Sequence, residues 1–183
     1  SCGIAMDETA WCWGRNASGR IGNGTSGIDR PLPTLVSGGG TWAVISAGGH
    51  SCGLQTDGVA YCWGNNSKGQ LGNGTLINTG TTGVLSAVNV QASFTAISAG
   101  TSHTCALDSL GDLYCWGWNG NLQLGDGTQT DRPMPIIAAT PASFAAPWTA
   151  LETGYAHTCA VDASGTTWCW GLNTQGQLGT GSA

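Results

Sequence analysis

Apolar residues along this chain come in short runs of three to five that alternate with stretches rich in glycine, asparagine and threonine. No run keeps the spacing of an amphipathic helix, and none approaches the roughly 20 residues needed to span a bilayer. One clear unit starts at Gly53-Leu54, turns at Thr56-Asp57-Gly58 and returns along Val59–Trp63, which is typical of a β-hairpin. The pattern therefore predicts an all-β protein built from hairpins.

The hairpin unit occurs four times along the sequence. Its cysteine, turn and Cys-Trp-Gly positions superpose in residues 1–25, 51–75, 104–128 and 158–182. The first cysteine of each unit falls at position 2, 52, 105 or 159, so the period is a little over 50 residues. A period of this length suits one blade of a propeller or one coil of a solenoid.

Two further strands are predicted in the connecting segments, residues 26–50, 76–103 and 129–157. One is apolar and precedes a histidine in each segment, at Trp42–Ser46, Phe94–Ser98 and Trp148–Glu152. The other follows a glycine-rich loop, at Pro33–Val36 and Met134–Ala138. Two such strands and a hairpin make a four-stranded blade. We therefore expect residues 1–183 to form a single repeat domain.

A family resemblance rests on three motifs in the third unit. ISAGTSHTCAL (97–107), YCWG (114–117) and QLGDGT (123–128) together resemble the repeat of the regulator-of-chromosome-condensation family. The resemblance implies a β-propeller of four-stranded blades, part of a seven-bladed ring or a ring of similar size. Leu122 departs from the pattern, because the sister units have glycine at that position.

The number of units does not close a ring, because four hairpins are joined by three connecting segments. We expect a partial array of about four repeats cut from a longer propeller. An open array is the alternative. Unpaired strand edges promote association, so self-assembly through open blade edges is a candidate property.

Charge excludes two classes of partner. Only 8% of the residues are charged, the net charge is −5 and the isoelectric point is near 4.7. The cations are scattered, at Arg15, Arg20, Arg30, Lys68 and Arg132. Nucleic-acid binding and polybasic membrane anchoring both need clustered cations, so neither is expected, and nor is membrane insertion. The chain starts at Ser1 without a signal peptide, and we expect that processing or truncation has removed any targeting segment.

All eight cysteines belong to the repeat, two in each hairpin with nine residues between them. If each hairpin is centred on its turn, the two cysteines lie directly opposite one another, at a distance that a disulfide accepts. The predicted bridges are Cys2–Cys12, Cys52–Cys62, Cys105–Cys115 and Cys159–Cys169. Disulfides persist in oxidising compartments, so the chain is predicted to be secreted, periplasmic or exposed on a cell surface.

The three histidines offer an alternative use for the cysteines. His50, His103 and His157 each precede a first cysteine by two residues, a spacing that could indicate zinc. Each unit would supply only three ligands, and the first unit has no histidine, so no metal or other cofactor is expected. We expect the histidines to be buried and hydrogen-bonded to backbone in the next loop.

Catalysis is not expected, because residues at equivalent repeat positions spread around a ring. A nucleophile, a base and an orienting group must lie within hydrogen-bond reach of one another. The recurring tryptophans are expected to pack between blades or over the disulfides, with a role as sugar platforms as the alternative. They are Trp13, Trp63, Trp116 and Trp170.

Binding residues are expected where the units differ. The position after Trp-Gly is variable, and Trp118 there is a large aromatic residue in a predicted exposed turn, where hot spots are enriched in aromatics. Its alternative role is packing over the irregular loop at Leu122. The other candidate binding residues are Lys68, Arg15 and Tyr155. Four asparagines begin glycosylation sequons, although the recurring ones also suit turn capping; they are Asn16, Asn23, Asn65 and Asn73.

The predicted function is a non-catalytic extracellular or cell-surface scaffold that presents propeller loops to a protein or glycan partner, as an adhesin does. The alternatives are a structural subunit of an extracellular fibre or coat, and a secreted inhibitor of an extracellular enzyme. The resembled family is known for nucleotide exchange on a nuclear GTPase. An oxidised, acidic chain is unsuited to that activity, so the resemblance is taken to imply shape alone.

Overall fold

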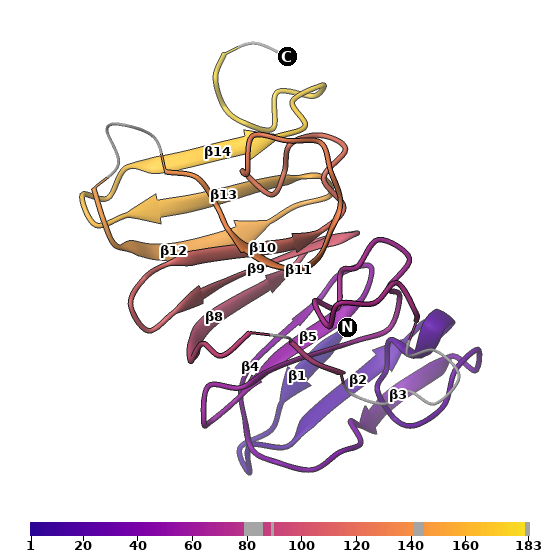
Figure 1. Ribbon diagram of the computed structural model, residues 1–183. Helices are drawn as coiled ribbons and strands as arrows, with labels where there is room; N and C mark the ends of the chain where they lie inside the picture. The colour runs from indigo at the N-terminus through magenta and orange to yellow at the C-terminus, as the bar shows by residue number, and fades with distance from the viewer. Residues whose placement is uncertain (79–85, 89, 141–144, 182–183) are drawn as a thin grey trace.

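Four antiparallel sheets stand side by side in the computed structural model, which describes residues 1–78, 86–88, 90–140 and 145–181 (Figure 1). The first sheet contains β1 (Cys2–Ile4), β2 (Ala10–Gly14) and β3 (Arg30–Leu35). The second contains β4 (Trp42–Ala47), β5 (Ser51–Gln55), β6 (Ala60–Trp63) and β7 (Ser86–Ala87). The third contains β8 (Phe94–Ala99), β9 (His103–Asp108), β10 (Leu113–Gly117) and β11 (Arg132–Ile137). The fourth contains β12 (Trp148–Thr153), β13 (His157–Asp162) and β14 (Thr167–Gly171).

The all-β architecture predicted from the sequence is confirmed, and we call the four sheets blades 1 to 4. Blades 2 and 3 have the expected four strands, and the described parts of blades 1 and 4 have three. Strand β7 and a short 3₁₀ turn, η1 (Ala17–Gly19), were not anticipated. The outer strands β3 and β11 begin earlier than predicted, because a bulge lets Arg30 pair with Gly14 and Arg132 with Gly117.

Strands β4, β8 and β12, the first strands of blades 2 to 4, form the inner side of the array. Strand β8 contacts both β4 and β12 across the blade boundaries. Ala99 of β8 donates its amide to the hydroxyl of Ser46 in β4 at 3.0 Å, and Thr153 of β12 donates likewise to Ser98 in β8 at 3.0 Å. Short polar side chains on the inner strands thus join each blade to the next.

The hydrophobic cores lie between blades. Each core pairs the aromatic residue that opens an inner strand with the tryptophan of the Cys-Trp-Gly motif, as in Trp42 and Trp63, whose ring centroids are 5.8 Å apart. A leucine from the preceding blade's Gln-Leu-Gly loop fills the space beside this pair; Leu71 and Leu124 are fully buried. A blade therefore completes its core only against its neighbour.

Alternating strand direction sends the connections to two opposite faces. The loop face comprises residues 15–29, 64–78, 118–131 and 172–181 with the short loops 48–50, 100–102 and 154–156. The backbone bond from Trp118 N to Ser102 O, 2.8 Å, links the two sets of loops. The turn face carries the hairpin turns, at residues 5–9, 56–59, 109–112 and 163–166. Among the described residues, no helix has the length and apolar character needed to cross a membrane.

Candidate functional site

The four hairpins are each closed by a disulfide between directly opposed cysteines. The bonds join Cys2 to Cys12, Cys52 to Cys62, Cys105 to Cys115 and Cys159 to Cys169, with Cα–Cα distances of 4.0–4.1 Å. These are the pairs predicted from the sequence spacing. All eight cysteines are used, so no thiolate is left to bind zinc beside the histidines. The four bonds are consistent with an oxidising compartment.

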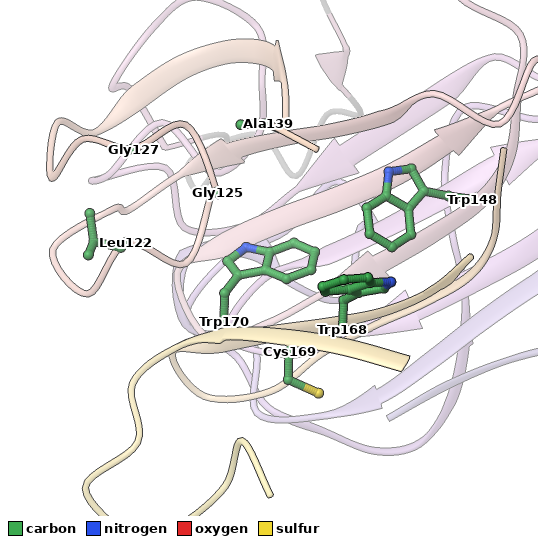
Figure 2. Close-up of a pocket in the computed structure, with 8 residues that line it drawn as sticks. All are labelled: Leu122, Gly125, Gly127, Ala139, Trp148, Trp168, Cys169 and Trp170. Carbon is green, nitrogen blue, oxygen red and sulfur yellow. The ribbon is translucent and has the colours of Figure 1, made fainter. Parts of the chain in front are cut away.

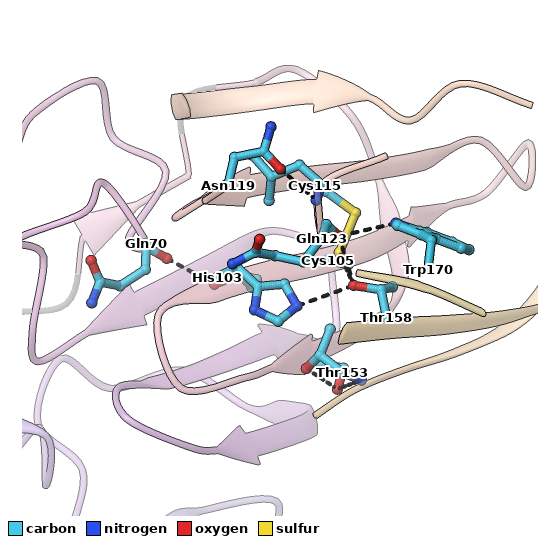
Figure 3. Close-up of a disulfide and its surroundings, with 12 residues drawn as sticks. Gln70, His103, Cys105, Cys115, Asn119, Gln123, Thr153, Thr158 and Trp170 are labelled. Carbon is cyan, nitrogen blue, oxygen red and sulfur yellow. Dashed lines mark hydrogen bonds between the residues drawn. A yellow bond between two sulfur atoms is a disulfide. The ribbon is translucent and has the colours of Figure 1, made fainter. Parts of the chain in front are cut away.

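A hydrogen-bond network joins blades 2, 3 and 4 to the loop of the blade before, as Figure 3 shows around Gln123. In blade 4 the carbonyl of Gln123 accepts two bonds, from the Thr158 hydroxyl at 2.8 Å and from the Trp170 indole N–H at 3.0 Å. The carbonyl of Gln70 accepts the equivalent pair from Thr104 and Trp116 of blade 3. The tryptophans therefore pack between blades, the first of the two placements anticipated.

The histidines extend this network. His103 Nε2 lies 3.1 Å from the Thr158 hydroxyl, and His50 Nε2 lies 2.6 Å from that of Thr104. The Nε2 atoms therefore bond to a side chain and not to the loop backbone, because the threonine of the next blade lies between the ring and the loop carbonyl. Since each threonine hydroxyl already donates to that carbonyl, the histidine Nε2 must be the donor.

Burial keeps two of these imidazoles neutral. His50 and His103 are fully buried, and their Nδ1 atoms have no hydrogen-bond partner among the described residues. Burial, reinforced by the neighbouring His103 and by Arg20, lowers the pKa of His50 to about 3. Burial and the neighbouring His157 lower the pKa of His103 to about 4. A neutral donor held in this way serves structure, and a proton-transfer role would need a substrate to reach the ring.

The recurring asparagines cap the loops that follow the hairpins. Asn119 donates its side-chain amide to Asp126 and to the Thr128 carbonyl, and its side-chain oxygen accepts the Leu124 amide at 3.0 Å. Asn16 makes the same kind of contacts to Thr25 and Ile21 and is fully buried. A glycan on Asn16 is incompatible with this fold, which corrects that candidate. Asn23, Asn65 and Asn73 are half-buried and stay predictions.

The four candidate binding residues all lie on the loop face. Arg15 and Lys68 are exposed, and Lys68 forms an ion pair with Asp131 at 3.2 Å. Tyr155 is 65% exposed. Trp118 is half-buried, not exposed as predicted, because its indole lies against Gly120; a Cβ atom there would meet the indole nitrogen at 2.7 Å.

Charge differs between the two faces. The loop face and its margin carry all five cations and four carboxylates, which are Asp29, Asp126, Asp131 and Glu152. The turn face carries six carboxylates and no cation; they are Asp7, Glu8, Asp57, Asp108, Asp112 and Asp162. The turn face therefore carries a formal charge of −6, and the loop face, at +1, is nearly neutral.

A cavity of about 390 Å³ lies between blades 3 and 4 (Figure 2). Its wall on blade 4 is formed by Trp148, Trp168 and Trp170, and its wall on blade 3 by Leu122 and neighbouring glycines. Sequence reasoning did not anticipate this cavity. The sequence signal for it was Leu122, which stands where the sister units have glycine.

Comparison with known proteins identifies the family to which the repeat belongs. Residues 7–54, 57–107 and 111–161 match the regulator of chromosome condensation (RCC1) repeat, and a second description of that repeat matches residues 94–123 and 148–177. The ultraviolet-B receptor UVR8 of Arabidopsis thaliana is 39% identical over 87 residues, covering 48% of this chain and 19% of the receptor. The E3 ubiquitin-protein ligase HERC2 of Homo sapiens is 32% identical over 87 residues, covering 48% of this chain and 2% of the ligase.

Two solved structures share the arrangement of the sheets. Human WBSCR16 superposes with a TM-score of 0.85 at 21% identity, over 97% of this chain and 46% of that protein. Yeast RCC1 (Prp20), in its complex with Kap60, superposes with a TM-score of 0.77 at 19% identity, over 94% of this chain and 41% of that protein. This chain thus spans less than half of either structure and a fifth or less of the two curated relatives. The predicted propeller fold is confirmed, and since the repeat matches most of its length, this chain belongs to the regulator of chromosome condensation (RCC1) repeat family.

Proposed function

We propose that the chain is a non-catalytic protein-binding scaffold that works in an oxidising compartment, outside the cell or on its surface, and that its loop face receives the partner. The supporting observation is that the repeated and the variable residues make different contacts. The repeated histidine, threonine and asparagine side chains form hydrogen bonds within and between blades. The residues that vary between units, Arg15, Lys68, Trp118 and Tyr155, are left at one face.

Composition also favours the loop face over the turn face. Protein interfaces are enriched in tryptophan, tyrosine and arginine and depleted in acidic residues at their centres. The loop face has the first set and is nearly neutral, whereas the turn face has six carboxylates without a cation. A solved relative, yeast RCC1 (Prp20), was crystallised bound to the protein Kap60, which supports a protein partner over a glycan.

A matched pair of variants tests whether the loop face binds a partner protein. The loop-face variant carries Arg15→Ala, Lys68→Ala, Trp118→Ala and Tyr155→Ala, and the control carries Met6→Ala, Leu110→Ala and Asp112→Ala on the turn face. Immobilised protein is exposed to the extracellular and surface fraction of the source organism, and bound proteins are identified by mass spectrometry. We expect a partner that the wild type and the control retain and the loop-face variant loses by roughly tenfold or more. Equal recovery on the loop-face variant would contradict the proposal.

Two further measurements separate the alternatives. Thiol labelling of cell-derived protein without reductant should find all eight cysteines blocked, and free thiols would argue against an oxidising compartment. Light scattering across a range of protein concentrations should show a constant size. Growth in size with concentration would favour a fibre or coat subunit, and recovery of a hydrolase that the chain inhibits would favour the inhibitor.

A further inference from the structure

Blades 1 and 3 each begin their outer strand with an arginine, and the two arginines differ in their partners. In blade 3, Arg132 Nε donates to Asp126 Oδ2 at 2.8 Å, and the same guanidinium forms an ion pair with that oxygen at 2.7 Å. In blade 1, Arg30 pairs with the glycine of the Cys-Trp-Gly motif as Arg132 does, so the two positions are equivalent. Arg30 Nε is buried, but no atom among the described residues accepts its hydrogen. A buried donor without an acceptor lowers stability.

The residue of blade 1 that corresponds to Asp126 is Asn23, which has an amide in place of the carboxylate. Asn23 Oδ1 accepts the backbone amide of Thr25 at 3.2 Å and its hydroxyl at 2.7 Å. Asp126 Oδ1 accepts the same two groups of Thr128, both at 2.9 Å. Asn23 therefore presents its amide nitrogen at the place from which Asp126 Oδ2 binds an arginine. An amide nitrogen donates hydrogen bonds and cannot accept one from Arg30.

The arginines are placed alike with respect to these loops. Arg30 Nη2 lies 3.4 Å from the hydroxyl of Thr25, and Arg132 Nη2 lies 3.3 Å from that of Thr128. Turning the Asn23 amide over would aim its oxygen at the guanidinium, but the backbone amide of the threonine would then face a donor. An amide has a single oxygen, so it serves one side of this site, whereas a carboxylate serves both.

The carboxylate of blade 3 shows how the completed site behaves. Burial raises the pKa of Asp126, but bonds from Thr128, Arg132 and Asn119 outweigh it, and the pKa lies below its usual value. The group is therefore ionised at neutral pH, and its bonds to arginine are charge-assisted. The site in blade 1 differs from this arrangement by an NH2 group in place of an oxygen atom.

The sequence supplies a reaction that makes this exchange. Asn23 is followed by Gly24, whose lack of a Cβ leaves the path of its backbone nitrogen unobstructed. That nitrogen attacks the side-chain carbonyl carbon of Asn23, a C–N bond forms, and the side-chain nitrogen leaves as ammonia with the proton of the Gly24 amide. Water then adds to the same carbon and breaks the new C–N bond. The products are an aspartate at position 23, an intact backbone and ammonium.

We propose that Asn23 is a self-modification site, at which deamidation after folding produces the carboxylate that pairs with Arg30. The new ion pair ties the start of β3 to the loop at residues 15–29, as the pair of Asp126 with Arg132 does in blade 3. The reaction needs only water as co-reactant. It does not depend on which partner binds the loop face, so it stands or falls without the proposed function. A glycan on Asn23 would occupy the nitrogen that leaves, so the two modifications exclude each other.

Asn73 of blade 2 provides a matched control. It is followed by Gly74 and Thr75, so the local sequence is the same, and its Oδ1 accepts the Thr75 amide at 3.0 Å. In the sequence, Thr79 stands where blades 1 and 3 have arginine. A carboxylate at position 73 therefore gains no guanidinium partner of this kind.

Variants that carry the product test the ion pair. Asn23→Asp should lower the equilibrium constant for unfolding in urea about tenfold, because Arg30 Nε gains a charged acceptor. Asn73→Asp should change that constant by less than about twofold. In the background of Arg30→Met, which keeps an apolar stem, Asn23→Asp should also change it by less than about twofold. The proposal is overturned if Asn23→Asp does not stabilise the protein, or if it does so equally without Arg30.

Ageing of the wild type tests the reaction itself. Protein produced without glycosylation, with its disulfides intact, is kept in mildly alkaline buffer and sampled over weeks by peptide mass spectrometry that separates aspartate from isoaspartate. We expect aspartate to accumulate at position 23 and the unfolding constant of the aged protein to approach that of Asn23→Asp. Retention of the Asn23 amide throughout would overturn the proposal. Isoaspartate as the main product would also overturn it, because isoaspartate adds an atom to the backbone and moves the carboxylate away from Arg30.

Discussion

Blade 3 and blade 4 are built from nearly the same local sequence and differ in their surroundings. Both have the His-Thr-Cys strand, the Cys-Trp-Gly strand and the same disulfide geometry. In blade 3 the disulfide, His103 and Trp116 are completely buried. In blade 4 the equivalent cysteines, His157 and Trp170 are half-buried. The hairpin is thus specified locally, whereas its burial depends on a fourth strand and on a neighbour at each side.

The contribution of a residue to the stability of this protein should therefore differ from blade to blade. A repeat protein gains stability from contacts between adjacent units as well as from the units themselves. Blade 3 has both of its neighbouring blades, and the described part of blade 4 has one. The same substitution should therefore cost more in blade 3 than at the equivalent position in blade 4.

The largest expected difference concerns the tryptophan of the Cys-Trp-Gly motif. Trp116→Ala should lower the free energy of unfolding by about 4 kcal/mol, since it empties a fully buried site and removes the bond to the Gln70 carbonyl. Trp170→Ala should lower it by about half as much, because Trp170 is half-buried. Urea unfolding without reductant measures both values. Equal losses of free energy would contradict the expected difference between blades 3 and 4.

The pH dependence of stability should come next. In the unfolded chain a histidine binds a proton below about pH 6.5, but folded His50 and His103 resist protonation down to a pKa of about 3 and about 4. The free energy of unfolding should therefore fall between pH 6.5 and pH 4, by about 4 kcal/mol in total for the two groups at pH 5 relative to pH 7. The double variant His50→Gln with His103→Gln should lose most of this slope in urea titrations. An unchanged slope would mean that other groups cause it.

The disulfides should give a smaller contrast. Replacing Cys159 and Cys169 by alanine should cost about 2 kcal/mol through the larger freedom of the unfolded chain. Replacing Cys105 and Cys115 should cost about 1 kcal/mol more, because those sulfurs are fully buried and leave a cavity. Under mild reductant, mass spectrometry of the wild type should find the Cys159–Cys169 bond opened before Cys105–Cys115. Simultaneous opening would show that the two blades unfold together.

The smallest effect is expected at Leu122. Leu122→Gly should raise the free energy of unfolding by about 0.5 kcal/mol, because glycine accepts the left-handed conformation but loses more chain entropy on folding. Differential scanning calorimetry against wild type resolves a change of this size. Destabilisation by more than 1 kcal/mol would show that the leucine side chain already packs productively in the cavity.

The sequence predicted the repeat, the hairpins and the cysteine pairs because these depend on residues close together in the chain. The nine-residue spacing in Cys52–Cys62 fixes opposed positions in a hairpin whatever surrounds it. Strand β7 and the half-burial of Trp118 escaped prediction. Strand β7 has only two residues, too few to show an alternating pattern, and Trp118 is covered by the backbone of its own loop.

The candidate sites divide in the same way. The variable positions Arg15, Lys68, Trp118 and Tyr155 could be identified by comparing units, but their location on one face follows from the alternation of strand direction in the folded blades. The histidine partners could not be predicted, since His103 reaches a threonine 55 residues away in the next blade.

By itself, the sequence determined that the protein is a stapled array of β-hairpins with the RCC1-type repeat, because turn residues, alternation and cysteine spacing act within a single unit. Only the tertiary structure decided which equivalent residues are buried, which carbonyl the tryptophan and threonine share, and where a cavity lies between blades 3 and 4. Those features depend on contacts between units about 50 residues apart, and packing across blade boundaries leaves no local pattern in the chain.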